Sequence, residues 1–137
     1  MTNVALNKPV TMSSMHQYPP TPTPEMLTDG NRSDVYPCPH SELETNPEAI
    51  IDLEQTYGIT GIYIVNRVDC CPQRLHDLII QIGDTLADLK TVFNHTSPIG
   101  DTCTILFGAP QHGRYVKLYI EGTEYLTICE VEVYSDL

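Results

Sequence analysis

The chain has 137 residues, which suits a single domain over residues 1–137 with a hydrophobic core of its own. Its 18 Asp and Glu residues outnumber 7 Lys and Arg, which gives a formal net charge of -11. This balance argues against a nucleic-acid-binding protein and against one that adheres to anionic membranes, because both depend on Lys and Arg contacts with phosphate. Neutral polar ligands such as sugars, and cations, are compatible with this charge.

The sequence contains no run of 18 apolar residues, so we expect no membrane insertion. Residues 1–6 lack the basic start and the long apolar segment of a signal peptide, which leaves two readings, an intracellular protein or a mature secreted domain. Asn31-Arg32-Ser33 and Asn94-His95-Thr96 are sequons that permit N-glycosylation if the protein is secreted in a eukaryote.

The regular structure expected along the chain consists almost entirely of short strands. Residues 18–24 contain four prolines, which exclude a helix and a central strand and predict a stiff extended loop, with a PxxP-type recognition motif as the alternative. Apolar runs with alternating or β-branched residues then predict strands at residues 50–53, 59–65, 78–82, 104–107, 115–120 and 126–134. Residues 85–90 are the one segment for which we expect a helical turn.

Short strands separated by Gly, Pro, Asn and Asp predict an all-β fold, an antiparallel β-sandwich of the jelly-roll type. Binding sites on such folds lie in the loops at one end of the sandwich. Residues 66–74 fall between two predicted strands and are therefore a candidate for such a loop.

This segment, Asn-Arg-Val-Asp-Cys-Cys-Pro-Gln-Arg, holds two of the four arginines of the chain. An arginine presents five N–H donors in a planar fork, and Asp69 can hold such a fork or orient a histidine. The pattern therefore predicts a polar binding site. The alternative is a surface cluster of ion pairs, which would add little to stability.

Five cysteines allow two disulfides and one thiol, or five free thiols: Cys38, Cys70, Cys71, Cys103 and Cys129. Adjacent Cα atoms lie about 3.8 Å apart, below the usual disulfide range of about 4.4–6.8 Å. The residues alone therefore favour two thiols at Cys70 and Cys71 that are free or paired elsewhere.

His40, Arg67, Asp69 and Arg74 follow the spacing His-(26 residues)-Arg-x-Asp-(four residues)-Arg, with Cys70-Cys71 inside it. In this pattern the chain resembles the F-type lectins, a fucose-binding family. Further matching segments extend the resemblance over nearly the whole chain, at residues 3–7, 29–31, 46–47, 113–116 and 129–134. The resemblance implies a discoidin-like (F5/8 type C-like) sandwich and a non-catalytic lectin for terminal L-fucose. No Gly-x-Ser-x-Gly, His-Glu-x-x-His or Walker motif is present, so we expect no enzyme.

The resemblance also assigns roles to residues. His40, Arg67 and Arg74 would hydrogen-bond the sugar, Asp69 would support them, and a Cys70–Cys71 disulfide would pack against the sugar ring and its C6 methyl. A Cys38–Cys129 disulfide would tie the His40 loop to the last strand. Cys103 would be a free thiol, with an intermolecular disulfide as the alternative.

One structural Ca²⁺ is a further implication of the resemblance. Its ligands would be Asp29, Asn31 and Glu130, together with the backbone carbonyls of Met26 and Cys129. Such a ligand set suits the hard cation, which prefers several oxygen donors.

Two features depart from the family. Residues 48–49 are Glu-Ala where the family often has a tryptophan pair, and the proline-rich loop at 18–24 is unusual. Candidates for secondary sugar contacts beside this loop are His16, Gln17, Tyr18 and Tyr36. We expect fucosylated glycans as partners, multivalency through oligomers or tandem or fused domains, and an extracellular location. The alternative is a discoidin-like adhesion module for a protein or lipid head group, or a site for an anionic glycan.

Overall fold

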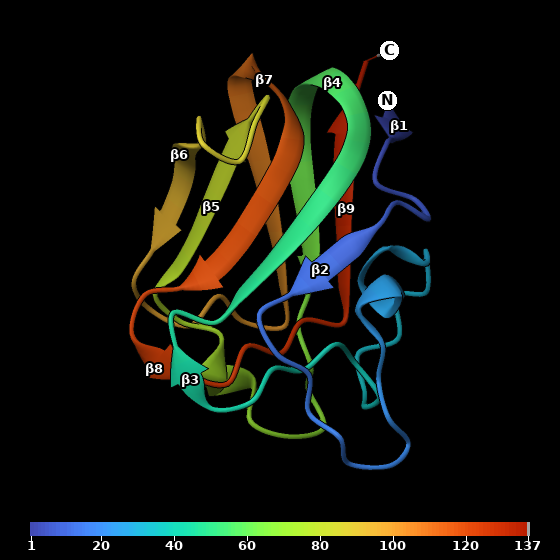
Figure 1. The fold of residues 1–137 in the computed structure, drawn as a ribbon, viewed down its shortest axis with the longest axis vertical. Coiled ribbons are helices and arrows are strands. Elements are labelled where there is room, and N and C mark those ends of the chain that lie inside the picture. Colours follow the sequence, from blue (N-terminus) through green and yellow to red (C-terminus); the bar gives the residue numbers. More distant parts are fainter. Residues whose placement is uncertain (137) are drawn as a thin grey trace.

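The computed structural model describes residues 1–136, which form an antiparallel β-sandwich (Figure 1). Its strands are β1 (Thr2–Asn3), β2 (Val10–Met12), β3 (Glu44–Thr45), β4 (Glu48–Val65), β5 (Leu78–Gly83), β6 (Lys90–His95), β7 (Thr102–Ile120), β8 (Thr123–Glu124) and β9 (Glu130–Ser135). Two short 3₁₀ helices, η1 (Pro24–Thr28) and η2 (Pro72–Arg74), complete the regular structure of the described residues. The all-β, antiparallel prediction is confirmed.

Strands β4 and β7 each run through both layers of the sandwich, and both bend over its upper end in Figure 1. In one layer, the first half of β4 pairs with β2 and with the second half of β7, which also pairs with β5. In the other layer, the second half of β4 pairs with β9 and with the first half of β7. Register shifts after Asp52 and after Ile59 mark the bend, as expected where a strand passes from one layer to the other. Four of the predicted strands are therefore halves of two continuous ones.

The core lies between the two layers and is built from alternate residues of the strands, because successive side chains of a strand point to opposite faces. Its central members are at most 1% exposed: Ile51, Leu53, Ile62, Ile64, Leu78, Ile80, Val116, Leu118 and Ile120. The alternation read from the sequence at 78–82 and 115–120 is thus the alternation that fills the core.

The prediction of a helical turn at residues 85–90 is wrong. This segment is the tight connection between β5 and β6, where the Asp88 N–H donates to the Thr85 carbonyl at 3.1 Å. It folds back onto the end of β5 so closely that a Cβ added at Gly83 would lie 2.2 Å from the Asp88 carbonyl oxygen. Helical turns form instead in η1 and η2, each with a proline at its start, where the missing N–H costs no hydrogen bond. The prediction of no helix at 18–24 therefore fails at Pro24.

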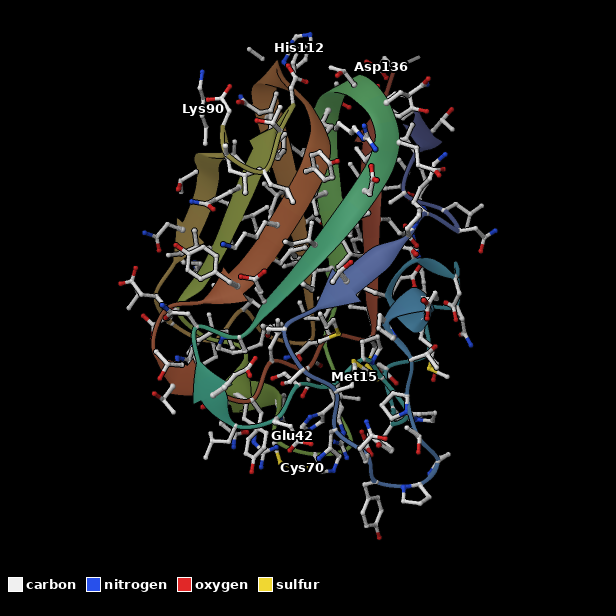
Figure 2. The ribbon with its side chains drawn as sticks, viewed as in Figure 1. Met15, Glu42, Cys70, Lys90, His112 and Asp136 are labelled. Carbon is white, nitrogen blue, oxygen red and sulfur yellow. A yellow bond between two sulfur atoms is a disulfide. The ribbon has the colours of Figure 1, made fainter. Side chains whose placement is uncertain are left out.

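The loops that carry Met15, Glu42 and Cys70 lie at the opposite end of the sandwich from the two termini. Cys70, Glu42 and Met15 are at the lower, loop end in Figure 2, and His112 and Asp136 are at the upper end. The Met1 amino group lies 4.0 Å from the Asp136 carboxylate. Within residues 1–136, no helix combines the length and the apolar character that crossing a bilayer requires.

Candidate ligand-binding site

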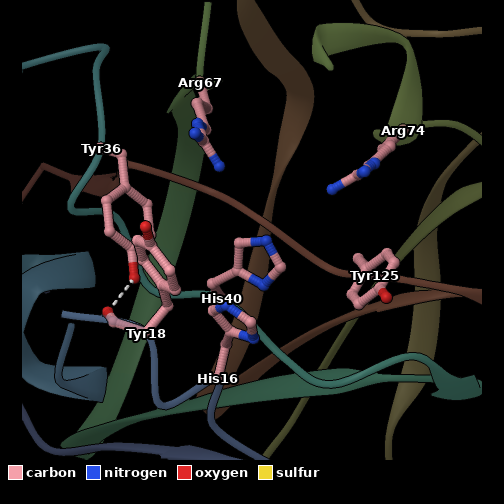
Figure 3. Close-up of a pocket in the computed structure, with 7 residues that line it drawn as sticks. All are labelled: His16, Tyr18, Tyr36, His40, Arg67, Arg74 and Tyr125. Atoms are coloured by element: carbon pink, nitrogen blue, oxygen red, sulfur yellow. Dashed lines mark hydrogen bonds between the residues drawn. The ribbon is translucent and has the colours of Figure 1, made fainter. Parts of the chain in front are cut away.

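A pocket of about 310 Å³ opens among the loops at the lower end of the sandwich (Figure 3). Four segments that are distant in sequence contribute to its lining: His16, Tyr18, Tyr36, His40, Arg67, Arg74 and Tyr125. Six of these seven residues are candidates named from the sequence, and Tyr125 was missed. Arg67 and Arg74 point into the pocket from opposite sides, with the His40 ring between them (Figure 3).

Arg67 is held by a carboxylate and an aromatic ring. Its Nε donates to Asp69 Oδ1 at 2.9 Å, and its guanidinium carbon lies 4.8 Å from the centre of the Tyr36 ring. Asp69 Oδ1 also accepts the Tyr36 backbone N–H at 3.2 Å. The hydrogen bond from Arg67 holds the pKa of the Asp69 carboxyl below its usual value, so Asp69 stays ionised. Asp69 does not line the pocket, and it therefore acts on the site through Arg67.

His40 is 4% exposed and has its orientation set by the backbone. Its Nδ1 lies 2.7 Å from the Ser41 carbonyl oxygen, so Nδ1 carries the proton and Nε2 is left as an acceptor in the neutral ring. Burial lowers the pKa of His40, and the charges of Arg67 and Arg74 lower it further. His40 is therefore neutral at pH 7. Of the two groups that Asp69 could have oriented, it holds the arginine, and the Ser41 carbonyl holds the histidine.

Arg74, at the end of η2, has a different environment from Arg67. Among residues 1–136 it has no carboxylate within 4.0 Å, and its guanidinium carbon lies 4.7 Å from the centre of the Tyr125 ring. A cation over an aromatic face is attracted by the ring quadrupole. Arg74 is thus fixed against an aromatic surface while its N–H donors remain available to a ligand.

Asn66 closes the loop that separates the two arginines. Its side chain is buried, and Nδ2 donates to the carbonyls of Pro72 at 2.9 Å and Gly100 at 3.0 Å. Its Oδ1 accepts the Arg67 backbone N–H at 2.8 Å. No role for Asn66 was predicted from the sequence, although an asparagine directly after an apolar strand is a common turn residue.

The structure contains disulfides between Cys38 and Cys129 and between Cys70 and Cys71. The adjacent pair lies in the loop between Arg67 and Arg74, half-exposed, but it is not part of the pocket lining. Cys103 is the one free cysteine of the described residues, and burial raises the pKa of its thiol. The thiol is therefore protonated at neutral pH.

The residues named as calcium ligands meet at one place beside η1. Met26, Asp29, Asn31 and Cys129 line a second pocket of about 200 Å³. Glu130 is fully buried next to it, where its Oε2 accepts the Gly30 N–H at 3.0 Å and its Oε1 has no hydrogen-bond partner. Burial and the neighbouring Asp29 charge raise the pKa of Glu130 to about 8.

An orphaned, buried carboxylate oxygen beside a second carboxylate is an arrangement that a cation would stabilise. Within residues 1–136, no three His, Cys, Asp or Glu side chains converge to hold a metal. A cation here would therefore need amide and backbone oxygens, as from Asn31, Met26 and Cys129. The donor set fits a hard, oxygen-preferring ion and does not fit zinc.

The fold and the loop-end pocket define a discoidin-like β-sandwich with a polar ligand site, and the family model for the NedA-like, galactose-binding domain (F5/F8 type C) matches residues 26–118. The fucolectin of Anguilla anguilla is 42% identical, over 79% of this chain and 73% of that protein. The chain belongs to the fucolectin family of F-type lectins.

Two solved structures are similar over almost the whole chain. The f-lectin from the serum of Morone saxatilis, striped bass, has a TM-score of 0.88 and 37% identity, covering 97% of this chain and 48% of that chain. A fucose binding module of Streptococcus pneumoniae, SpX-3, has a TM-score of 0.86 and 28% identity, with 100% of both chains covered. The chain thus spans about half the length of the striped bass lectin.

Proposed function

We propose that the pocket binds terminal L-fucose on glycans, without catalysis, and that this chain is a calcium-stabilised lectin. The observation that carries the proposal is the convergence of His40, Arg67 and Arg74 on one pocket at the loop end. Two arginines supply donors for sugar hydroxyl oxygens, and the neutral His40 ring supplies an acceptor for a hydroxyl hydrogen. Similar proteins are named fucolectin or fucose binding module, which supports the same ligand.

The remaining candidates are assigned supporting roles in this proposal. The Cys70–Cys71 disulfide does not line the pocket itself, but it lies on the loop between Arg67 and Arg74, where it would offer a small apolar surface to the C6 methyl that distinguishes fucose from galactose. His16, Tyr18 and Tyr36 form the wall towards the proline-rich loop, where the Tyr36 hydroxyl donates to the Tyr18 carbonyl at 2.8 Å. They would contact the sugars next to the terminal fucose.

Titration calorimetry with two sugars tests this function. L-fucose and L-galactose differ by one hydroxyl at C6, so L-fucose is expected to bind and L-galactose to bind at least about tenfold more weakly, because the added hydroxyl would lie unpaired against an apolar surface. Absence of L-fucose binding to the oxidised, calcium-loaded protein would overturn the proposal.

The acid dependence of binding follows from His40. The pKa of this buried ring lies below its ordinary value of 6.5, so we expect the fucose affinity to be unaffected by His40 above pH 6.5 and to fall in more acidic solution. A proton on Nε2 would remove the acceptor and add a charge facing Arg67 and Arg74. Calorimetry at constant ionic strength between about pH 7 and about pH 5 measures this fall in affinity.

His16, whose ring centre lies 4.8 Å from that of His40, provides the matched control. If His40 is the group that titrates, the fucose affinity of His16→Gln should still fall in acidic solution, as it does in the wild type. An affinity that stays constant or rises in acid would contradict the assignment.

Calcium is expected to bind at Asp29, Asn31 and Glu130 and to stabilise the fold. At a free concentration of 100 times Kd, a ligand stabilises the folded state by about 2.7 kcal/mol. We therefore expect chelation to lower Tm by about 10 °C in this chain. Calcium should restore Tm, and magnesium should not, because its smaller octahedral shell suits a dedicated all-protein site poorly.

Glu130→Gln keeps the size of the side chain and removes its charge, so its Tm should not respond to the chelator. Differential scanning calorimetry measures both proteins. A wild-type Tm that does not change on chelation would contradict a bound calcium ion.

A second candidate ligand is favoured by the environment of Arg74, which has no carboxylate partner in the described part of the chain. A sulfated or sialylated glycan would pair with this guanidinium, and its affinity would fall with added salt because an exposed ion pair is screened. Binding of neutral fucose should depend little on salt. Glycan arrays at low and high salt distinguish the two ligands.

We further propose an extracellular lectin whose avidity comes from several copies. One shallow pocket binds a monosaccharide weakly, and linked copies raise the apparent affinity without a new contact. Size-exclusion chromatography with light scattering, on the natural full-length protein, measures the number of pockets per particle.

A further inference from the structure

Arg74 and Tyr125 are joined by a closed ring of contacts that runs through His76 and Glu124. Arg74 lies over Tyr125, and His76 follows two residues later, with its backbone N–H donating to the Arg74 carbonyl at 3.1 Å. His76 Nε2 lies 3.0 Å from Glu124 Oε2. Glu124 Oε1 accepts the backbone N–H of Tyr125 at 2.9 Å, which returns the ring to its starting point.

The Glu124 carboxylate thus helps to position both partners of the contact between Arg74 and Tyr125. Glu124 holds the segment that carries Arg74 through the His76 ring, and it holds the backbone of Tyr125 directly. The Tyr125 ring also lies edge-on to His40, with 5.4 Å between the ring centres. The position of Tyr125 therefore affects two of the three polar groups of the pocket.

We propose that His76, Glu124 and Tyr125 are positioning residues that hold Arg74 in its ligand-binding orientation. The readout in sugar affinity depends on the fucose site proposed above. Arg67 has Asp69 to hold its guanidinium, whereas Arg74 has no such carboxylate among the described residues. An arginine that is free to change rotamer loses more conformational entropy when it binds a ligand. The ring of contacts takes the place of the missing ion pair.

The His76 part of the ring depends on its protonation. A neutral imidazole has one N–H, so only the protonated ring donates both to Asp77, at 2.7 Å, and to Glu124. Asp77 and Glu124 raise the pKa of His76 above 6.5. Glu44 on β3 is the cross-strand neighbour of Glu124 and adds negative charge on the same side. Both contacts are therefore complete below pH 6.5, and one is lost as the pH rises through the raised pKa.

The sugar experiment compares two substitutions of Tyr125. Tyr125→Phe keeps the aromatic face under Arg74, and Tyr125→Leu removes it; the Tyr125 hydroxyl has no hydrogen bond to another described residue. Tyr125→Leu is expected to bind L-fucose about 3- to 20-fold more weakly than Tyr125→Phe, the range that corresponds to a cation–π contact. Equal affinities of these two variants would overturn the role of Tyr125.

The pH experiment isolates His76. From about pH 6.5 to about pH 9, the wild-type affinity for L-fucose should decline as His76 loses its proton. His76→Gln does not titrate, so its affinity should be lower at the start and constant over this range. The same decline in His76→Gln as in the wild type would overturn the role of His76.

A measurement without sugar keeps this proposal separate from the proposed function. In ¹H–¹⁵N spectra, the Arg74 Nε–Hε signal should be that of an ordered side chain in the wild type and Tyr125→Phe, and that of a mobile one in Tyr125→Leu. Arg114, which pairs with Asp52 at 2.8 Å and stacks on Tyr115, is the internal control and should not change. A wild type that does not bind fucose would refute the ligand alone; an ordered Arg74 in Tyr125→Leu would refute the positioning role.

Discussion

Removal of the Cys38–Cys129 disulfide is expected to lower the free energy of unfolding by roughly 4–5 kcal/mol, because the bond closes a loop across most of the chain. The two cysteines are separated by 91 residues in sequence, and both are buried. The double variant Cys38→Ala/Cys129→Ala should therefore unfold at a much lower denaturant concentration. Equilibrium unfolding in guanidinium chloride measures the change directly.

Cys103→Ala is the matched control, since it removes a half-buried thiol that is not in a disulfide. This substitution should lower the free energy of unfolding by less than about 1 kcal/mol, as expected for a change that leaves the core and its cross-links intact. If the double variant were as stable as Cys103→Ala, the covalent cross-link would not contribute to the free energy of unfolding.

The same disulfide also affects the pocket. Cys38 lies two residues before His40, and His40 forms a β-bridge with Thr127, two residues before Cys129. Loss of the bond would loosen the backbone that orients the His40 ring. The double variant should therefore also bind fucose more weakly at temperatures where it is still folded.

Arg74→Ala is expected to lower the fucose affinity about 10- to 100-fold, since each hydrogen bond to a charged group contributes about 1.5–3 kcal/mol. Arg67→Ala should have a similar effect and would also leave Asp69 without its partner. The double variant Arg67→Ala/Arg74→Ala should show no measurable binding. Titration calorimetry with L-fucose measures all three.

Arg114→Ala is the control for charge and stacking. Arg114 also pairs with a carboxylate and stacks on a tyrosine, but it lies on β7 away from the pocket. Its replacement should leave the fucose affinity unchanged within about twofold. Equal losses in Arg114→Ala and Arg74→Ala would mean that the overall charge, and not the pocket, determines binding.

The layers of the fold could be predicted from the sequence, but the continuity of β4 and β7 could not. Alternation identifies residues 59–65 and 115–120 because each places its apolar residues on one buried face. The bends at 53–58 and 107–114 contain glycines and a proline, which are also the residues of ordinary turns. Whether such a segment turns back or passes into the other layer depends on tertiary pairing.

The binding site, too, could be predicted from the sequence only in part. The spacing of His40, Arg67 and Arg74 is visible in the sequence, and the structure places all three around one pocket. Tyr125 is one of eight tyrosines, and nothing in its local sequence indicates that it lies under an arginine 51 positions earlier. The Ser41 carbonyl that orients His40 has no sequence signature, because every residue has a carbonyl.

The two ends of the described chain, Met1 and Asp136, lie side by side at the pole opposite the pocket. A tether attached at either end would therefore leave the pocket facing away from its anchoring point. Several copies attached to a common support would all present their pockets on the side that faces away from the support. A short bridge between the two ends would also allow the chain to be opened at another surface loop, giving a circularly permuted protein with the same pocket.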